Sequence, residues 1–197
     1  MASPQRYTCC RTHARFPDKM NSSVSQSITA PSAWVRRWAG LIPPQGRVLD
    51  LPCGSGRHTR YLTQLDHPVE AVDRDLSSLG EVAHLPAVSA RSADLEASPW
   101  PYVGERFAGI VITHYLHRPL FPHLLAALEP GGVLIYETFA LGNERYGRPS
   151  NPNHLLMPGE LLEVVRGVLR VVAYEDLFVP ELKPAMLQRI CAVRPGA

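Results

Sequence analysis

The sequence predicts an α/β fold in which a mostly parallel sheet is covered by helices on both faces. From residue 47 to residue 139, short continuous apolar runs alternate with segments of helical periodicity, the pattern of a parallel sheet buried on both sides. The last two apolar runs, 171–178 and 186–193, are separated only by a short Pro-containing loop. Two strands without an intervening helix pair as a hairpin, so one antiparallel strand is expected in the sheet.

The first half of the chain contains the beginning of this pattern. Pro31 and Gly40 bracket a short helix with Trp34, Val35 and Trp38 on one face. A strand over 47–51 then runs into a glycine turn, and a helix follows whose apolar stripe is formed by Tyr61, Leu62 and Leu65. The expected elements up to residue 92 are a helix over 31–40, a strand over 47–51, a helix over 56–65, a strand over 69–73, a helix over 76–83 and a strand over 87–92.

The second half continues the alternation and then changes. A strand over 109–114 is followed by a helix over 119–128 with leucines at helical spacing. Pro130-Gly131-Gly132 predicts a hard stop and a turn, after which a strand runs over 133–139. A helix over 158–166 precedes the terminal hairpin.

The glycine turn after the first strand predicts a nucleotide-cofactor cradle. Gly54 and Gly56 let the backbone pass close to a ligand, and the helix that follows offers free amide donors. A dinucleotide is disfavoured because Thr59 occupies the third glycine position of G-x-G-x-x-G, and no Gly-Lys-Ser/Thr of a P-loop follows. Asp73, at the end of the next strand, can accept hydrogen bonds from both ribose hydroxyls of an adenosine.

Composition and charge limit the class of protein. The 197 residues, 45% hydrophobic and 19% charged, indicate one globular domain. The net charge of +2 arises from a surplus of three positive charges in residues 1–19, so the remainder carries −1 and has no basic signature for nucleic acid. We expect residues 1–30 to be a disordered basic extension, with Met20 as an alternative start, and residues 31–197 to be the functional domain.

Cellular location and metal content are predicted from what the sequence lacks. It has neither an apolar run of membrane-spanning length nor a secretory h-region. The four cysteines form no C-x-x-C pair, so we expect no metal site and reduced thiols in the cytoplasm.

The order of the motifs resembles the class I S-adenosylmethionine-dependent methyltransferases over roughly residues 31–197. The resemblance rests on four segments: Val48–Gly56, Ala71–Asp73, Ala93–Leu95 and Leu128–Ile135. It implies a Rossmann-like, seven-stranded, mostly parallel sheet with a C-terminal antiparallel hairpin, and S-adenosyl-L-methionine as the cofactor. The C-terminal part, from Gly159 to Arg189, is similar to the tellurite-resistance-type branch.

The resemblance also implies roles for the cofactor-binding residues. Asp50 would fix the turn and hold the amino-acid end of the cofactor, while Gly54 and Gly56 would pass under its methionine part. Asp73 would bind the ribose hydroxyls. The family's usual first glycine is Pro52 here, and a proline has no N–H to donate to a ligand.

The adenine and the methyl group have further expected neighbours. Asp94 would accept a hydrogen bond from the adenine amino group, and the backbone of Leu95 would complete the recognition of the base. Thr113, at the tip of the fourth strand, would line the cofactor cleft. His114 shares that position, near the methyl group.

Two segments offer candidates for catalysis and substrate binding. Residues 113–119 follow the fourth strand, where open α/β sheets bind their ligands, and His114, Tyr115 and His117 are the catalytic candidates there. Arg118 is a candidate substrate-binding residue. The loop 140–156 is long for a compact domain and is typical of a lid. Its candidates for binding an anionic substrate are Arg145, Tyr146 and Arg148.

The sequence favours a methyltransferase that acts on a small molecule, since the domain has no added recognition module and is nearly neutral. The alternatives are a methyltransferase acting on RNA or protein, and a catalytically silent protein that binds S-adenosylmethionine. A dinucleotide oxidoreductase is the remaining enzyme alternative, disfavoured by Thr59 and the terminal hairpin. The sequence does not identify the methyl acceptor or the oligomeric state.

Overall fold

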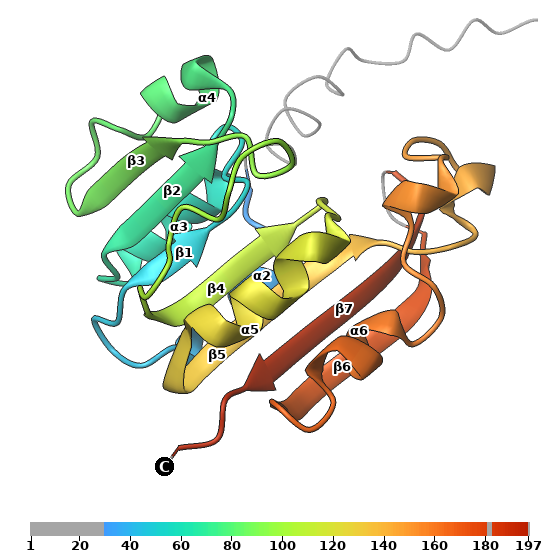
Figure 1. Cartoon of the computed structure of the whole chain (residues 1–197). Coiled ribbons are helices and arrows are strands. Elements are labelled where there is room, and N and C mark those ends of the chain that lie inside the picture. Colours follow the sequence, from blue (N-terminus) through green and yellow to red (C-terminus); the bar gives the residue numbers. More distant parts are fainter. Residues whose placement is uncertain (1–29, 181–182, 197) are drawn as a thin grey trace, which may run out of the picture. The chain divides into compact units, whose positions relative to one another are not determined.

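A seven-stranded sheet forms the centre of the fold (Figure 1). The computed structural model describes residues 30–180 and 183–196, and residues 31–197 form one compact unit. The disorder predicted for the N-terminal extension falls on residues that lie outside the described range, apart from Ala30. Within the described residues, no helix is both long and apolar enough to span a bilayer.

The strand order is β3-β2-β1-β4-β5-β7-β6, and β1 to β5 run parallel to one another. β7 runs antiparallel to both β5 and β6, which confirms the predicted fold class and its terminal hairpin. The strands are β1 (Val48–Asp50), β2 (Val69–Asp73), β3 (Val88–Ser92), β4 (Phe107–Thr113), β5 (Leu128–Phe139), β6 (Arg170–Val179) and β7 (Ala185–Val193).

Helices cover both faces of the sheet, as the continuous apolar strands predict. On one face, Trp34 of α2 and Leu62 of α3 pack with Val111 of β4. On the other face, Leu124 of α5 and Leu161 of α6 pack with residues from the same strands, such as Ile110. The helices are α2 (Ala33–Trp38), α3 (Arg57–Gln64), α4 (Leu76–Gly80), α5 (Phe121–Ala127) and α6 (Glu160–Val165), and short 3-10 turns lie at 39–41, 118–120, 143–145 and 152–154.

The buried face of α3 differs from the predicted stripe. Leu62 is fully buried, but Leu65 is 38% exposed because the helix ends at Gln64. The residues that α3 turns inward are His58, Thr59 and Leu62. The first turn of α3 therefore buries polar side chains, because it lies at the carboxyl edge of the sheet, where Asp50 and Thr113 end their strands.

The Pro-Gly-Gly segment does not separate α5 from β5 as predicted. Pairing with β4 already begins at Leu128, opposite Phe107, and resumes at Val133 opposite Gly109 after a shift of register. Gly131 lies in the left-handed region (φ +80°) and donates its N–H to Arg194 O. The glycines thus form an irregularity that stays attached to the sheet, so the helix ends at Ala127 without an intervening loop.

Candidate functional site

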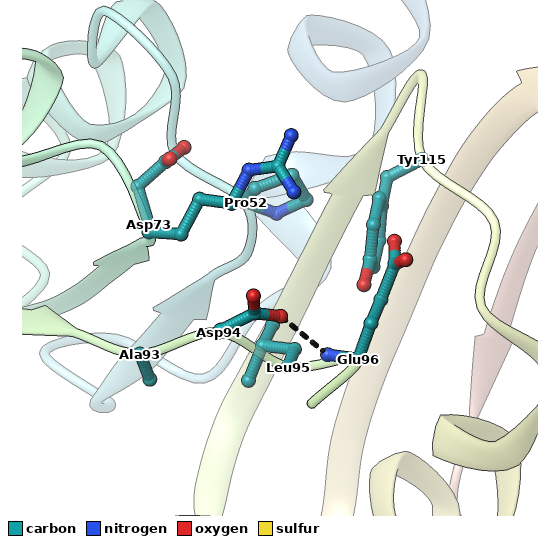
Figure 2. Close-up of a pocket in the computed structure, with 8 residues that line it drawn as sticks. Pro52, Asp73, Ala93, Asp94, Leu95, Glu96 and Tyr115 are labelled. Atoms are coloured by element: carbon teal, nitrogen blue, oxygen red, sulfur yellow. Dashed lines mark hydrogen bonds between the residues drawn. The ribbon is translucent and has the colours of Figure 1, made fainter. Parts of the chain in front are cut away.

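A pocket of about 260 Å³ lies at the carboxyl edge of the sheet, beside the ends of β1 to β4 (Figure 2). We call it the carboxyl-edge pocket. It is lined by Pro52, Asp73, Arg74, Ala93, Asp94, Leu95, Glu96 and Tyr115. Four of the predicted site residues, namely Asp73, Asp94, Leu95 and Tyr115, are therefore brought to one place from three separate strand ends.

Asp73 is held in a fixed orientation by two backbone donors. Gly54 N donates to its Oδ2 and Asp75 N donates to its Oδ1, each at 2.9 Å. Each carboxylate oxygen keeps a lone pair beyond these bonds. Two adjacent hydroxyl groups are the ligand feature that matches such a pair of acceptors.

Asp94 is anchored in the same manner at the far side of the pocket. Its Oδ1 accepts hydrogen bonds from Glu96 N at 3.0 Å and Ala97 N at 3.1 Å. These two bonds lower the pKa of Asp94, with Arg74 and His117 contributing, so the group stays ionised. Its carboxylate can therefore accept from an amino group, as the adenine edge would require.

The charges around the pocket select against phosphate. Asp73, Asp94 and Glu96 contribute three carboxylates, while Arg74 is the one cation among the lining residues. Like charges repel one another, most strongly where water is partly excluded. A dinucleotide or nucleoside triphosphate would bring further negative charge to this wall, whereas an uncharged adenosine would not.

Tyr115 forms the wall that faces Asp94 (Figure 2). Burial raises the pKa of its phenol, and the carboxylate of Glu96 raises it further. The phenol is therefore protonated at neutral pH and serves as a donor or an apolar wall rather than as a general base.

The two glycines of the turn have different surroundings. Gly54 has φ +52°, and a Cβ built on it would meet nothing within 4 Å. Gly56 has φ +76°, and its Cβ would lie 1.9 Å from Cγ1 of Val82. Gly54 thus borders open space next to Asp73, where a ligand chain can pass, whereas Gly56 is required by close packing against the segment that follows α4.

Asp50 lies beneath the turn and is 1% exposed. Thr59 Oγ1 donates to its Oδ2 at 2.6 Å. Burial raises the pKa of Asp50 to about 7, although the hydrogen bonds from Thr59 and the charge of Arg57 oppose the shift. The predicted role of Asp50 at the cofactor's amino-acid end stays a prediction, since its carboxylate accepts a hydrogen bond from Thr59.

A second group of polar residues lies at the end of β4. His114 has φ 54°, a strained conformation for a non-glycine residue, and its N–H donates to Glu137 O at 2.8 Å. Its ring stacks on Phe139 at a centroid distance of 4.9 Å. Desolvation, with Arg57 and Arg189 nearby, lowers the pKa of His114 to about 4, so the ring is neutral at neutral pH.

Arg57 opens α3 directly after the turn and is half-buried. Within residues 30–180 and 183–196, no hydrogen bond or ion pair engages its guanidinium, although Glu137 and Asp50 act on it through their charges. A half-buried cation without a direct partner is suited to bind an anionic group of a ligand.

Arg118 is engaged within the protein rather than placed at the carboxyl-edge pocket. Its Nε and Nη2 donate to the two carboxylate oxygens of Glu160 at 2.7 and 2.9 Å. Its remaining bonds go to Asn153 O and Leu155 O. The guanidinium therefore fastens the 140–156 loop to the start of α6, and its predicted contact with substrate stays a prediction.

The other predicted residues of this region lie outside the pocket lining. His117 is half-buried and close enough to Asp94 to lower its pKa. Arg145 and Arg148 are exposed on the loop, and Tyr146, 46% exposed, packs against Phe178 of β6. The lid function of the loop stays a prediction.

Sequence reasoning missed four residues of the site. Arg74 and Glu96 line the pocket, and each stands within two residues of an acid that the motifs singled out. Arg57 and His58 follow Gly56 directly, so their position at the N-terminus of a cofactor-binding helix was visible in the sequence. In the described part of the chain, no three His, Cys, Asp or Glu side chains gather to form a potential metal site.

The fold and the carboxyl-edge pocket are those expected of a class I S-adenosylmethionine-dependent methyltransferase, and matches to a family model and to a curated methyltransferase support this class. The family model of "Tellurite resistance protein TehB" matches residues 9–126. The chain therefore belongs to the TehB family.

Relatives and solved structures agree with this assignment. The phthiotriol/phenolphthiotriol dimycocerosates methyltransferase 1 of Mycobacterium ulcerans (strain Agy99) is 29% identical over 157 residues, which cover 72% of this chain and 57% of that protein. TehB from Haemophilus influenzae has a similar fold, with a TM-score of 0.72 and 20% identity over 87% of this chain and 65% of that one. This chain thus spans less than two thirds of both proteins.

A third similar structure covers more of its own chain. The 1,6-didemethyltoxoflavin-N1-methyltransferase of Burkholderia thailandensis, with bound 1,6-didemethyltoxoflavin and S-adenosylhomocysteine, has a TM-score of 0.63 and 20% identity. The match covers 88% of this chain and 81% of that one.

Proposed function

We propose that this protein transfers a methyl group from S-adenosyl-L-methionine to a small-molecule acceptor. The observation that carries the proposal is the pair of anchored carboxylates in the carboxyl-edge pocket. Asp73 presents two acceptors suited to ribose hydroxyls, and Asp94 presents an acceptor suited to the adenine amino group. The pocket's surplus of carboxylates favours an adenosine without phosphates over a dinucleotide.

The bound cofactor would supply an electrophilic methyl group on a sulfonium, and the protein's own residues would position and shield the reactants. Gly54 would let the methionine part pass from the pocket toward the ends of β1 and β4. His114, neutral at the end of β4, would stand beside the acceptor with Phe139 as an apolar backing. Alignment of an acceptor behind the methyl group is the main contribution of such a site.

The small size of the acceptor is supported by two features. Residues 20–197 carry a net charge of −1, which offers no attraction to nucleic acid. One protein of similar fold, the 1,6-didemethyltoxoflavin-N1-methyltransferase of Burkholderia thailandensis, holds the small molecule 1,6-didemethyltoxoflavin, and another, NodS from Bradyrhizobium japonicum, is an N-methyltransferase. We expect no membrane partner and a cytoplasmic location.

The first experiment is calorimetric titration of the full-length protein with S-adenosylmethionine, S-adenosylhomocysteine and NADH. Asp73→Asn removes the charge from the ribose-binding carboxylate, and its matched control is Asp66→Asn. Asp66 lies two residues past the end of α3 with φ 62°, a conformation that asparagine also accepts.

We expect saturable binding of the two sulfur ligands and none of NADH. Asp73→Asn should weaken binding by roughly 10-fold or more, since hydrogen bonds to charged groups contribute about 1.5–3 kcal/mol. Asp66→Asn should bind as the wild type does. Binding of NADH in place of the sulfur ligands would overturn the proposal in favour of an oxidoreductase.

A further inference from the structure

Ser32, His58 and Thr113 form a chain of hydrogen bonds beside the end of β4. Ser32 N donates to His58 Nε2 at 3.1 Å, and His58 Nδ1 lies 3.4 Å from Thr113 Oγ1. His58 is 2% exposed and Thr113 is 9% exposed. The chain connects the N-cap of α2 to the first turn of α3 and then to the tip of β4.

The bond from Ser32 fixes the tautomer of His58. A backbone N–H can only donate, so Nε2 must carry a lone pair. Burial, with the charge of Arg57, lowers the pKa of His58 to about 3, so the ring is neutral at neutral pH. In a neutral imidazole the proton then resides on Nδ1, and Nδ1–H donates to Thr113 Oγ1.

This tautomer in turn determines what the hydroxyl of Thr113 can do. With Oγ1 accepting from His58, its hydrogen must be donated to another group. In the part of the chain that the structure describes, no acceptor is recorded for that hydrogen. A nearly buried hydroxyl is thus left as a directed donor, and a ligand can supply the missing acceptor.

The location of Thr113 identifies the part of the ligand it would meet. The chain order reverses between β1 and β4, and open α/β sheets bind ligands at such a switch point. The nucleoside end is assigned to the ends of β2 and β3, so the remainder of the ligand extends toward β1 and β4. Arg57, half-buried at the start of α3, adds a cation to this region. A hydroxyl donor and a guanidinium together match a carboxylate, whereas an ammonium group would require acceptors.

We propose that His58 is a positioning residue that fixes the Thr113 hydroxyl as a hydrogen-bond donor to the carboxylate of S-adenosylmethionine. The proposal rests on the proposed function, because it takes the adenosine end as bound at Asp73 and Asp94. It assigns to His58 a role through Thr113 rather than direct contact with the reacting atoms.

The test compares two nucleosides that differ only at the end in question. S-adenosylhomocysteine carries the amino-acid carboxylate, whereas 5′-methylthioadenosine lacks the amino-acid group. Both are titrated calorimetrically into the full-length wild type, Thr113→Val and Thr113→Ser. Thr113→Val should weaken S-adenosylhomocysteine about 10-fold, the loss of one hydrogen bond to a charged group. Thr113→Val should change the Kd of methylthioadenosine by less than about 2-fold. Thr113→Ser keeps the hydroxyl and should bind S-adenosylhomocysteine as the wild type does.

The role of His58 is tested by substitution and by measuring the protonation of its ring nitrogens. His58→Asn keeps a donor close to the position of Nδ1 and should retain most of the affinity for S-adenosylhomocysteine. His58→Leu should weaken the binding of S-adenosylhomocysteine but not that of methylthioadenosine. His84→Leu, at an exposed histidine, is the matched control. In ¹⁵N-histidine spectra, the His58 signals should show a protonated Nδ1 and an unprotonated Nε2 at neutral pH.

The outcomes distinguish failure of this inference from failure of the proposed function on which it rests. Equal losses for both nucleosides in Thr113→Val, unchanged binding of both, or a protonated Nε2 would overturn the role of His58 while leaving the cofactor assignment in place. Failure of the wild type to bind either nucleoside would overturn the proposed function and this inference with it.

Discussion

Replacing Gly56 by alanine should destabilise the fold, whereas the same change at Gly54 should act on ligand binding. The Cβ added at position 56 would lie 1.9 Å from Val82 Cγ1, and Val82 is fully buried, so it cannot swing into solvent. The left-handed backbone at φ +76° adds a strain of about 1–2 kcal/mol. Overpacking of a core typically costs about 1–3 kcal/mol more.

The expected loss for Gly56→Ala is therefore about 2–5 kcal/mol in the free energy of unfolding. Since domains of this kind are stable by about 5–15 kcal/mol, the loss is readily measured by urea denaturation. Gly54→Ala is the matched control, because its φ of +52° carries a similar strain but its Cβ would meet nothing within 4 Å. It should lose about 1–2 kcal/mol of stability and, in calorimetry, weaken S-adenosylhomocysteine.

A double variant tests the physical cause. Val82→Ala shortens the side chain that the methyl group added at position 56 would strike, so Gly56→Ala combined with Val82→Ala should be more stable than the sum of the two single losses predicts. Strict additivity of the two substitutions, or equal destabilisation by Gly54→Ala and Gly56→Ala, would refute the steric reasoning.

Three further predictions concern charged residues. Because the folded-state pKa of Asp50 is raised to about 7, its contribution to stability is present below about pH 4 and is lost as the pH rises through about 7. In thermal unfolding, Asp50→Asn should therefore gain stability relative to the wild type between pH 4 and pH 8. A difference in stability between the two proteins that stays constant over this range would contradict the prediction. Arg118→Gln should increase amide hydrogen exchange in residues 151–157 while S-adenosylhomocysteine still binds, because the bonds of Arg118 to Glu160 and to the loop carbonyls are structural. Loss of binding with unchanged hydrogen exchange would instead favour a contact between Arg118 and the ligand. Asp94→Asn should reduce the preference for S-adenosylhomocysteine over S-inosylhomocysteine by about 10-fold in calorimetry, since the carboxylate would no longer accept from the adenine amino group; an unchanged preference would argue against the adenine assignment.

The periodicity of the sequence was sufficient for most of the fold. Alternating apolar runs and helical segments predicted every strand of the sheet, with β2 matching its predicted bounds. The absence of a helix between β6 and β7 predicted the antiparallel hairpin. These features follow from local chain geometry, since periods of two and 3.6 residues and the length of a connection are visible in one dimension.

The sequence also predicted two acids for the candidate site, Asp73 from its position at the end of β2 and Asp94, just past β3, from the resemblance to the methyltransferase family. The ends of neighbouring parallel strands meet at one edge, so their side chains converge without any further information. In the structure Asp73, Asp94, Leu95 and Tyr115 all line the carboxyl-edge pocket, and their roles in binding stay predictions.

What only the tertiary structure decided depends on contacts between residues far apart in the chain. Arg118 is fastened to Glu160, 42 positions away, and the tautomer of His58 is set by Ser32, 26 positions away. Gly54 and Gly56 look alike in the sequence, yet one borders open space and the other touches Val82. Periodicity and motifs specify where a residue stands on its own helix or strand. Its hydrogen-bond partners come from other elements, so they are determined only when the elements pack together.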